Sequence, residues 1–247
     1  MYIVGIGPGA LDHLTRKAYN AITQSQVIVG YKTYIGLISG LVSGKDIIAS
    51  GMTQEVDRVR LAIEKALEGK TVCLISSGDA GIYGMAGIAL EFLSSKEARN
   101  LEIEIVPGIM AATACASLLG APLAHDFAVI SLSDLLTDKR KIVERLKLAA
   151  KADFVIALYN PASIKRKELL REAWKILIKY KSPKTPVGIV KNAYRPGERI
   201  RITTLQDAPS VKDIDMFTTI IVGNSETCIK NGFMVTPRGY SMRKIKN

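Results

Sequence analysis

The stretch from Cys73 to Gly84 constrains the fold of this 247-residue chain more than any other. Residues 71–75 form a short, apolar, β-branched run, which predicts a buried strand, and a helix can start after Gly84. A strand, a glycine-rich turn and a helix in this order place backbone groups at the carboxyl end of a strand, where open α/β sheets bind ligands. Asp79 is the only fixed charge in the turn and suits a ligand's amine or hydroxyl groups. The alternative is an ordinary turn that only joins strand to helix.

The amino terminus repeats this order. Residues 2–6 are predicted to form a strand that runs into Gly5-Ile-Gly-Pro-Gly9, and Asp12 is predicted to cap a helix. A G-x-G before a helix is part of the dinucleotide-binding fingerprint, but the third glycine is absent and Pro8 interrupts the pattern. NAD binding is therefore poorly supported. If the two strands are parallel, both turns lie at one edge of a sheet.

Strands and helices alternate along the rest of the chain. Further strands are expected at 26–29, 102–106, 127–132, 154–158, 187–190, 200–203 and 217–222. Helices are expected at 54–67, from the end of the glycine-rich turn to residue 92, and at 107–119, 139–150 and 165–179. Residues 120–126 have the character of a hinge between two such runs. We therefore predict two α/β domains, 1–120 and 121–247, with a cleft between them as the default binding site.

Charge divides the chain unequally. Residues 1–120 carry 10 Lys+Arg and 11 Asp+Glu, whereas residues 121–247 carry 24 and 12, for a total of +11. A basic half is typical of proteins that bind nucleic acid, a membrane surface or a polyanionic small molecule. Most of these cations, however, fall on predicted helix faces or in the tail, where solvated surface is the simpler interpretation. Without arginine-rich segments interleaved with aromatic residues, we expect no nucleic acid partner.

Cysteine and histidine usage limits the chemistry. The cysteines Cys73, Cys115 and Cys228 are odd in number and lack metal-ligand spacing, and His13 and His125 are the only histidines. We therefore expect no protein-bound metal and a reducing, cytoplasmic location. No apolar run reaches membrane-spanning length and the chain starts directly with a strand pattern, so we expect neither a membrane span nor a secretory signal.

Four loops together carry a family resemblance: Gly5-Ile-Gly-Pro-Gly9, Ser77-Gly-Asp79 with Ile82-Tyr-Gly84, Val106-Pro-Gly-Ile109, and residues 217–223. In this order and spacing the chain resembles the tetrapyrrole methylases, S-adenosylmethionine-dependent methyltransferases of cobalamin and sirohaem synthesis. Within the family, the chain resembles the subgroup that methylates C17 of precorrin-3B or cobalt-factor III and contracts the macrocycle. The motifs that carry this resemblance are Val235-Thr-Pro-Arg-Gly-Tyr240 and residues 125–127, 130–136, 157–161, 216–219 and 222–225. The chain departs from the subgroup's pattern at Asp138-Lys139 and at Ala162, and these departures bear on substrate binding rather than on the methyl donor site.

The resemblance implies a donor site without metal, made largely of backbone groups. The matching positions are Pro8, Ser77, Gly78, Asp79, Ile82, Met110, Ala111, Tyr159, Ala193 and Thr219. Methyl transfer is an in-line displacement in which alignment supplies much of the catalysis. A homodimer is also expected from the family and from the frequency of two-fold pairing.

The implied substrate is a polycarboxylate tetrapyrrole, which a basic domain would attract; any cobalt would belong to this substrate. Ring contraction needs proton transfers, for which the candidate residues are His125, Asp126, Asp134, Tyr31 and Lys32. For each of these residues, a structural or pocket-lining role is the simpler interpretation. Two further functions stay open: methylation of another corrin carbon or of a protein, as by diphthine synthase, and a basic nucleic-acid-binding module.

Overall fold

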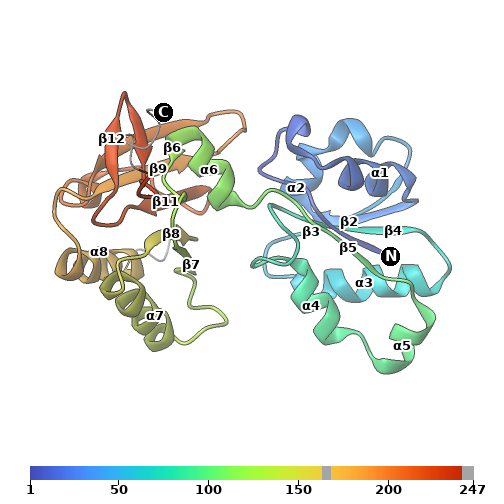
Figure 1. Ribbon diagram of the computed structural model, residues 1–247. Helices are drawn as coiled ribbons and strands as arrows, with labels where there is room; N and C mark the ends of the chain where they lie inside the picture. Colours follow the sequence, from blue (N-terminus) through green and yellow to red (C-terminus); the bar gives the residue numbers. More distant parts are fainter. Residues whose placement is uncertain (163–167, 241–247) are drawn as a thin grey trace. The chain divides into compact units, whose positions relative to one another are not determined.

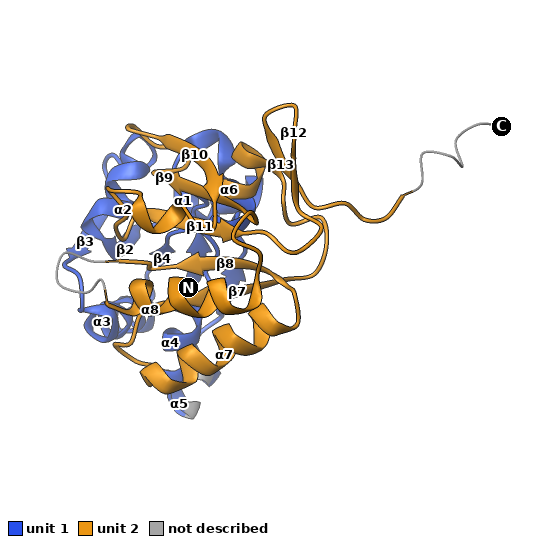
Figure 2. Cartoon of the chain, turned by 90° about the vertical axis from the view of Figure 1, so that its left-hand side faces the viewer, with its two compact units in different colours: residues 1–114 blue, residues 115–247 orange. Residues whose placement is uncertain are grey.

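The computed structural model describes residues 1–162 and 168–240, and the chain forms two compact units (Figures 1 and 2). Unit 1 is Met1–Ala114 and unit 2 begins at Cys115. The boundary lies inside helix α6 (Ala111–Leu119), earlier than the predicted boundary between residues 120 and 121. Within the predicted hinge, Gly120–Ala121 forms strand β6 instead, because it pairs with a strand from the end of the chain.

Unit 1 is built on a parallel sheet. Its strands are β1 (Tyr2–Gly5), β2 (Val27–Tyr31), β3 (Asp46–Ser50), β4 (Val72–Ser76) and β5 (Glu104–Val106). The strand order is β3-β2-β4-β1-β5, and every pair is parallel. Strands β1 and β4 are parallel neighbours, so the glycine-rich turns that follow them lie at the same edge of the sheet. All five carboxyl ends lie at one edge of the sheet, and we call this edge the carboxyl edge of unit 1.

Helices cover both faces of this sheet, because successive strand residues point to opposite sides. Ile3 packs into one buried cluster with Val59 of α3, whereas Val4 packs into another with Ile22 of α1. The helical segments are η1 (Leu11–His13), α1 (Arg16–Gln24), α2 (Lys32–Leu37), η2 (Ser39–Leu41), α3 (Glu55–Leu67), α4 (Met85–Phe92) and α5 (Ser95–Asn100). Burial on two faces explains the near-continuous apolar strands.

The cap of the first helix differs from the prediction. Thr15, rather than Asp12, is the N-cap of α1, and its hydroxyl accepts a hydrogen bond from the backbone N–H of Ala18 at 3.1 Å. Asp12 lies in the short 3₁₀ segment that precedes it. Both residue types cap helices well, so the local pattern alone did not decide between them.

The main sheet of unit 2 is mixed. Its strands are β7 (Phe127–Ser131), β8 (Val155–Tyr159), β9 (Pro186–Lys191), β10 (Arg199–Thr204) and β11 (Thr218–Val222), in the order β10-β9-β11-β8-β7. Only β7 and β8 pair in parallel. Helices α7 (Lys139–Lys151) and α8 (Glu168–Tyr180) and the 3₁₀ segment η3 (Ala208–Ser210) accompany it. The start of the helix predicted at 165–179 lies outside the described residues.

A small sheet, β12-β13-β6, completes unit 2. β12 (Cys228–Lys230) and β13 (Phe233–Val235) form a hairpin, and β6 pairs with β13. Asn231 and Gly232 turn the hairpin with φ of 52° and 81°, as a two-residue hairpin turn requires. Among the described residues, no helix is both long and apolar enough to cross a membrane.

Candidate functional site

The glycine-rich loops after β1 and β4 are joined by backbone hydrogen bonds at the carboxyl edge of unit 1. Gly7 and Gly78 form an isolated antiparallel bridge, with N–H···O distances of 3.0 Å and 2.9 Å. Next to it, the N–H of Ile6 donates to the carbonyl of Ser76 at 2.9 Å. Two loops far apart in the sequence are thus joined through their backbones.

Glycine is required where the loop after β5 meets the other two. A Cβ on Gly108 would lie 2.1 Å from the carbonyl oxygen of Gly78 and 2.7 Å from the backbone of Gly5. A Cβ on Gly5 would lie 2.6 Å from that same carbonyl oxygen. These neighbours are backbone atoms, which do not move aside as the end of a flexible side chain does. The three loops therefore pack backbone against backbone.

Gly78 differs from these two glycines. It has φ +65°, which side chains rarely adopt, but a Cβ there would meet nothing closer than Ala111 N at 3.8 Å and Met110 Cα at 3.9 Å. A Cβ on Gly78 would therefore be in ordinary van der Waals contact with the segment that begins α6. The β4 loop and the start of α6 thus lie next to each other.

The carboxylate of Asp79 links the loops after β4 and β5. Its Oδ1 accepts the N–H of Gly81 at 2.8 Å, and its Oδ2 accepts the N–H of Gly108 at 3.0 Å. The charge that was predicted to face a ligand is therefore engaged by the protein's own backbone.

The structure brings most of the predicted donor residues of unit 1 together. Pro8 is buried in the β1 loop, and Ser77, Gly78 and Asp79 are half-buried in the β4 loop. Met110 and Ala111, at the start of α6, are among the residues that a Cβ on Gly78 would contact. Ile82 lies further along the β4 loop with 39% of its surface exposed.

The predicted donor residues of unit 2 also share one sheet edge. β8 and β9 both run antiparallel to β11, which lies between them. Tyr159 at the end of β8 and Ala193 just after β9 therefore flank Thr219 near the start of β11. Thr219 is 7% exposed and pairs with Val190 in the sheet. We call this edge the loop edge of unit 2.

Non-glycine residues in left-handed conformations shape this loop edge. Asn160, Asn192 and Tyr194 have φ of 51°, 51° and 56°. Asn160 donates its side-chain amide to the hydroxyl of Ser131 at 2.9 Å. Such conformations cost energy and persist where the surroundings fix them, which is typical of functional loops.

Tyr194 is tied down at both ends. Its hydroxyl lies 2.8 Å from that of Ser117, and its N–H donates to the carboxylate of Glu198 at 2.6 Å. These contacts fix the loop that carries Ala193. Sequence analysis missed Tyr194, although an aromatic residue directly after a candidate contact was a usable signal.

Cys115 lies beside Thr219 in unit 2. Burial raises the pKa of its thiol to about 11, and the hydrogen bond with Thr219 only partly opposes this shift. The thiol is therefore protonated at neutral pH and is no nucleophile.

The candidates for proton transfer fall into two groups. Tyr31 and Lys32 lie at the end of β2, next to β4 at the carboxyl edge of unit 1, and Tyr31 packs edge-on against Tyr34 at 5.0 Å. Asp134 is exposed in the segment that follows β7, at the loop edge of unit 2.

His125 and Asp126 precede β7 and so lie at the opposite edge of that sheet from Tyr159. A five-residue strand separates the two edges by roughly 15 Å. The side chains of His125 and Asp126 are 44% and 79% exposed and contact each other at 3.4 Å. Within unit 2, the structure does not bring this pair to the loop edge.

A buried arginine that sequence analysis missed lies near the carboxyl edge of unit 1. Arg58 on α3 is 4% exposed and donates to the hydroxyl of Ser50 at 2.7 Å and to the carbonyl of Gly51 at 2.8 Å. It also contacts the sulfur of Met85, the first residue of α4, at 3.6 Å. Burial lowers the pKa of its guanidinium group. Arg58 lies among apolar residues in the helix predicted at 54–67, and this position could have indicated that its side chain is buried.

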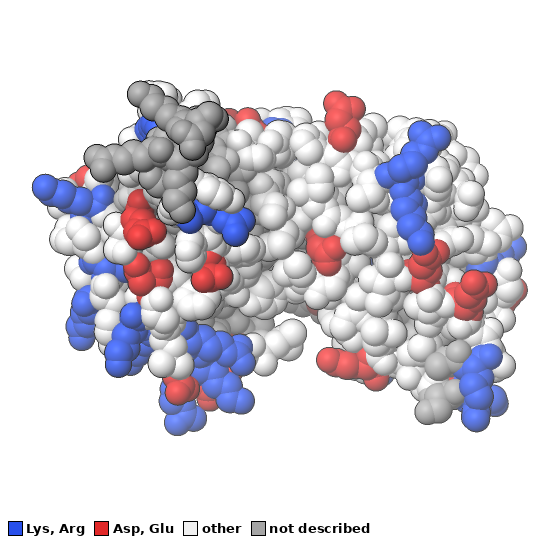
Figure 3. All heavy atoms as spheres, in the orientation of Figure 1, with Lys and Arg blue, Asp and Glu red and all other residues white. Residues whose placement is uncertain are grey.

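Half of the 18 Lys and Arg residues that the structure describes in unit 2 lie on helices α7 and α8. Figure 3 shows them gathered over α7 and α8. The exposed cations of α7 are Lys139, Arg140, Lys141, Arg145, Lys147 and Lys151, whereas its buried residues are Ile142, Leu146 and Ala150. These cations belong to the solvated face of an amphipathic helix. The charge of this helix therefore needs no ligand to account for it.

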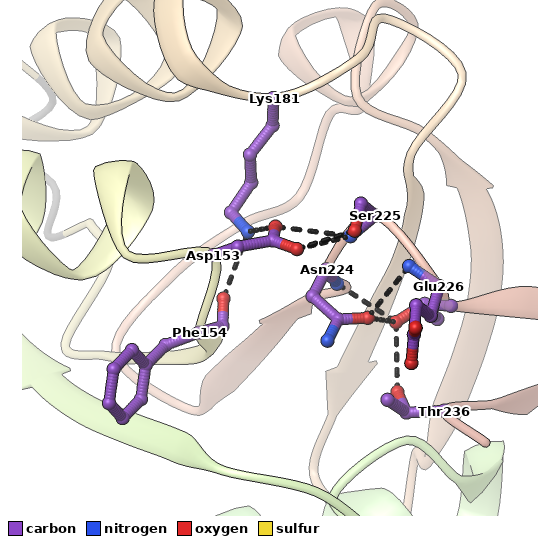
Figure 4. A network of polar contacts seen from close by, with 8 residues as sticks. Asp153, Phe154, Lys181, Asn224, Ser225, Glu226 and Thr236 are labelled. Atoms are coloured by element: carbon purple, nitrogen blue, oxygen red, sulfur yellow. Dashed lines mark hydrogen bonds and ion pairs between the residues drawn. The ribbon is translucent and has the colours of Figure 1, made fainter. Parts of the chain in front are cut away.

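A side-chain network holds the edge of unit 2 opposite the loop edge (Figure 4). Lys181, whose side chain is 1% exposed, donates to Asp153 at 3.2 Å and to the carbonyl of Phe154 at 2.9 Å. The hydroxyl of Ser225 donates to Asp153 at 2.5 Å. Burial lowers the pKa of Lys181, and for Asp153 the bonds from Ser225 and Lys181 outweigh burial and lower its pKa.

A second set of hydrogen bonds begins at Asn224, next to Ser225, and reaches Thr236 after β13. Thr227 donates to Asn224 at 2.9 Å and lies 2.8 Å from the hydroxyl of Thr236, which in turn donates to the carbonyl of Pro122 at 2.7 Å. Asn224, Ser225 and Thr236 belong to motifs that the family resemblance rests on. In the structure, these side chains bond to other residues of unit 2 and stabilise the fold.

The comparisons with known proteins agree with this architecture. Glycine-rich loops at the carboxyl edge of a parallel sheet covered on both faces define a ligand-binding α/β protein. A model of the family described as tetrapyrrole (corrin/porphyrin) methylases matches residues 1–209. The chain therefore belongs to the tetrapyrrole methylase family, and the predicted resemblance and α/β fold class are confirmed. Among the described residues, no group of three or more His, Cys, Asp or Glu could hold a metal ion.

Individual relatives are also close. The cobalt-factor III methyltransferase of Priestia megaterium is 49% identical over 100% of this chain, which spans 46% of that protein's length. A probable cobalt-factor III C(17)-methyltransferase of Salmonella typhimurium is 48% identical, with 97% of this chain and 99% of that protein covered. The crystal structure of the methyltransferase CobJ matches with a TM-score of 0.90 at 35% identity, covering 96% of this chain and 98% of that one.

Proposed function

We propose that this protein transfers a methyl group from S-adenosylmethionine to C17 of a corrin precursor during cobalamin biosynthesis, with contraction of the macrocycle. The observation that carries the proposal is the carboxyl edge of unit 1. There, backbone hydrogen bonds join Gly7 to Gly78, and the β5 loop packs directly against them. Membership of the tetrapyrrole methylase family supports the methyl chemistry.

We propose that the donor contacts of unit 1 are made largely by backbone groups of Pro8, Ser77, Gly78, Ile82, Met110 and Ala111, with Asp79 in the same loop. The family resemblance also implies donor contacts for Tyr159, Ala193 and Thr219, which lie together at the loop edge of unit 2. The meeting of the β1, β4 and β5 loops through their backbones supports this assignment, because adenine and a sulfonium group need shape and hydrogen bonds. The bound donor supplies an electrophilic methyl group on a positively charged sulfur.

The chain's own contribution to the transfer is alignment. A macrocycle carbon displaces S-adenosylhomocysteine from the methyl group in line, so no covalent enzyme intermediate is needed. The protonated thiol of Cys115 is consistent with such a mechanism. For the proton transfers of ring contraction we propose Tyr31 and Lys32 beside β4 and Asp134 at the loop edge of unit 2. His125 and Asp126 are weaker candidates, because they lie at the other edge of their sheet.

The proposed substrate is a polycarboxylate tetrapyrrole. The names of the two relatives at 48% and 49% identity favour cobalt-factor III over its metal-free counterpart, precorrin-3B. In either case the cobalt would enter as part of the substrate. Arg195, Arg199 and Arg238 lie in or beside loops of unit 2 and are the cations that we propose for carboxylate recognition. Of these, Arg199 pairs with Asp213 at 3.4 Å in the structure, and a substrate carboxylate would have to compete with that exposed pair.

Anaerobic incubation tests the proposal. The protein is mixed with S-adenosylmethionine and, in separate reactions, with cobalt-factor III or precorrin-3B, and the product is examined by mass spectrometry and carbon-13 NMR. We expect a product with one added methyl group at C17 from cobalt-factor III. Consumption of neither substrate, or methylation at another carbon, would contradict the proposed function.

Two further proposals concern the assembly and its location. We propose a homodimer, as expected for the family, which light scattering at micromolar concentration would test; a monomer mass would contradict it. We also propose a reducing, cytoplasmic location, on the basis of cysteine usage. Cys73 and Cys115 are buried and Cys228 is exposed, and all three are free thiols.

A further inference from the structure

Asp79 stands out in the glycine-rich loops because both of its carboxylate oxygens are used within the protein. One oxygen accepts the N–H of Gly81 at 2.8 Å, which closes the turn after β4. The other accepts the N–H of Gly108 at 3.0 Å, which lies 29 residues away in the loop after β5. The first bond is local, and the second joins two loops.

The bond to Gly108 lies where the loops pack most tightly. A Cβ on Gly108 would be 2.1 Å from the carbonyl oxygen of Gly78, directly before Asp79. Glycine permits this close approach but does little to resist separation of the loops. A hydrogen bond to a charged acceptor is about twice as strong as one between neutral groups, so the carboxylate can hold the loops at this spacing.

We propose that Asp79 is a positioning residue for the methyl donor. Its carboxylate sets the spacing between the loops after β4 and β5, and the donor contacts the backbone that it positions. This inference rests on the proposed function. It replaces the prediction that the charge of Asp79 faces the amine or hydroxyl groups of the ligand.

Ligand analogues separate the two roles. The affinities of S-adenosylhomocysteine, 5′-methylthioadenosine, which lacks the amino-acid part, and 3′-deoxy-S-adenosylhomocysteine are measured by calorimetry for the wild type and for Asp79→Asn. A positioning role predicts that all three ligands lose affinity by the same factor, about tenfold or more. A loss that disappears for one analogue would assign a direct contact to the missing group and overturn the proposal.

Spectroscopy of the ligand-free protein supplies a second readout. In Asp79→Asn the amide signals of both Gly81 and Gly108 should move from their wild-type positions, because the same side chain accepts from both groups. The amide of Gly87 on α4 should keep its position. An unmoved Gly108 amide in a folded Asp79→Asn variant would overturn the proposal.

Controls distinguish this inference from the proposed function. Asp57→Asn removes an exposed carboxylate on α3 and should leave every affinity unchanged. Thermal unfolding reports whether Asp79→Asn folds, and Asp79→Glu gives a second variant with the charge retained, which should recover part of the lost affinity. If the wild type binds none of the three ligands, the proposed function and this inference fail together. If the wild type binds and Asp79→Asn binds equally well, only this inference fails.

Discussion

The two sheet edges that carry the predicted donor residues are held in different ways. At the carboxyl edge of unit 1, the loops meet backbone to backbone, as Gly108 and Gly78 show. At the loop edge of unit 2, side chains fix the loops, as in the contact between Tyr194 and Ser117. Backbone contacts tolerate few substitutions, whereas side-chain contacts can be replaced one at a time.

This difference indicates a division of roles. A family that uses one donor and many substrates benefits from a donor site made of backbone, because backbone geometry does not depend on side-chain identity. The loop edge of unit 2, for which we propose donor contacts as well as the nearby cation Arg195, can then vary through its side chains. We therefore expect substitutions at the carboxyl edge of unit 1 to have larger effects than those at the loop edge of unit 2.

The largest effect is expected for Gly108→Ala. The added Cβ would lie 2.1 Å from a backbone oxygen, so the loops must separate. Overpacking of this kind costs about 3 kcal/mol, and donor binding should be lost with it. Gly87→Ala is the control, because a Cβ there meets nothing within 4 Å on helix α4 and should stabilise by up to about 1 kcal/mol. Urea unfolding and calorimetry with S-adenosylhomocysteine measure both; equal stability of the two variants would contradict backbone packing.

Asp153→Asn should have the next largest effect, on stability alone. It leaves the ammonium group of Lys181, 1% exposed, without its charged partner, at a cost of about 2–3 kcal/mol after allowance for the half-exposed carboxylate. Asp213→Asn is a matched control, since Asp213 also has positive φ and pairs with an arginine, but the pair is 69% and 72% exposed. It should cost less than about 1 kcal/mol. If urea unfolding shows that both substitutions lower the free energy of unfolding by similar amounts, the buried pair contributes no more to stability than the exposed pair.

The effect of Asp153→Asn should depend on pH. The pKa of Asp153 is lowered in the folded protein, so its carboxylate stabilises the fold above the ordinary carboxyl pKa of about 4. That contribution is lost as the pH falls through the lower, folded-state pKa. The stability difference between wild type and variant should therefore shrink in acid. A difference that stays constant down to acid unfolding would contradict this assignment.

Asn192→Ala should have a smaller effect. Alanine disfavours φ 51° by about 1 kcal/mol, whereas Asn192→Gly should be nearly neutral. Asn231→Ala is the control, because Asn231 has φ 52° in the hairpin turn between β12 and β13. Both alanine variants should lose similar stability, but only Asn192→Ala should weaken donor binding, by a few fold. Loss of donor affinity in Asn231→Ala would show that the effect is not local to the loop edge.

The smallest effects are expected for single cations of unit 2. Arg195→Gln and Arg238→Gln should each raise the KM for the tetrapyrrole a few fold, since exposed pairs contribute at most about 1 kcal/mol and are screened by salt. Added salt should raise this KM while that for S-adenosylmethionine stays flat. Lys147→Gln, on the outer face of α7, should change neither. If the KM for the tetrapyrrole does not change with salt, the cations of unit 2 are ordinary solvated surface and do not bind the substrate. Lys244 and Lys246, predicted to have little effect, lie outside the described residues.

Much of unit 1 was predictable because its strands are buried on both faces and end in glycine-rich turns. β3 escaped prediction because an edge strand with exposed residues such as Ile47, 44% exposed, lacks the apolar run of a central strand. The hairpin of β12 and β13 was also missed, although Asn231-Gly232 is a strong hairpin signal. The antiparallel pairing in unit 2 depends on contacts between distant segments, which alternation of strands and helices does not report.

The candidate site was only partly predictable for a similar reason. Glycines at a strand end indicate close approach of backbone, and the loops of Gly7 and Gly78 do meet. The sequence showed that Asp79 is the only charge in its turn, but not that Gly108 would occupy one of its oxygens. A side chain's partner is decided by tertiary structure. The positions of His125 and Asp126 illustrate the same limit, because a motif does not reveal at which end of a sheet it lies.

The central claim is that backbone groups at the carboxyl edge of unit 1 hold the methyl donor. Titration of the isotope-labelled protein with S-adenosylhomocysteine, followed by amide chemical shifts, tests it most directly. We predict that the largest changes fall on the amides of Gly7, Gly78 and Ala111, with no comparable change on Gly44, a glycine of unit 1 in the segment before β3. Saturable binding that leaves the amides of Gly7, Gly78 and Ala111 unmoved would contradict the claim.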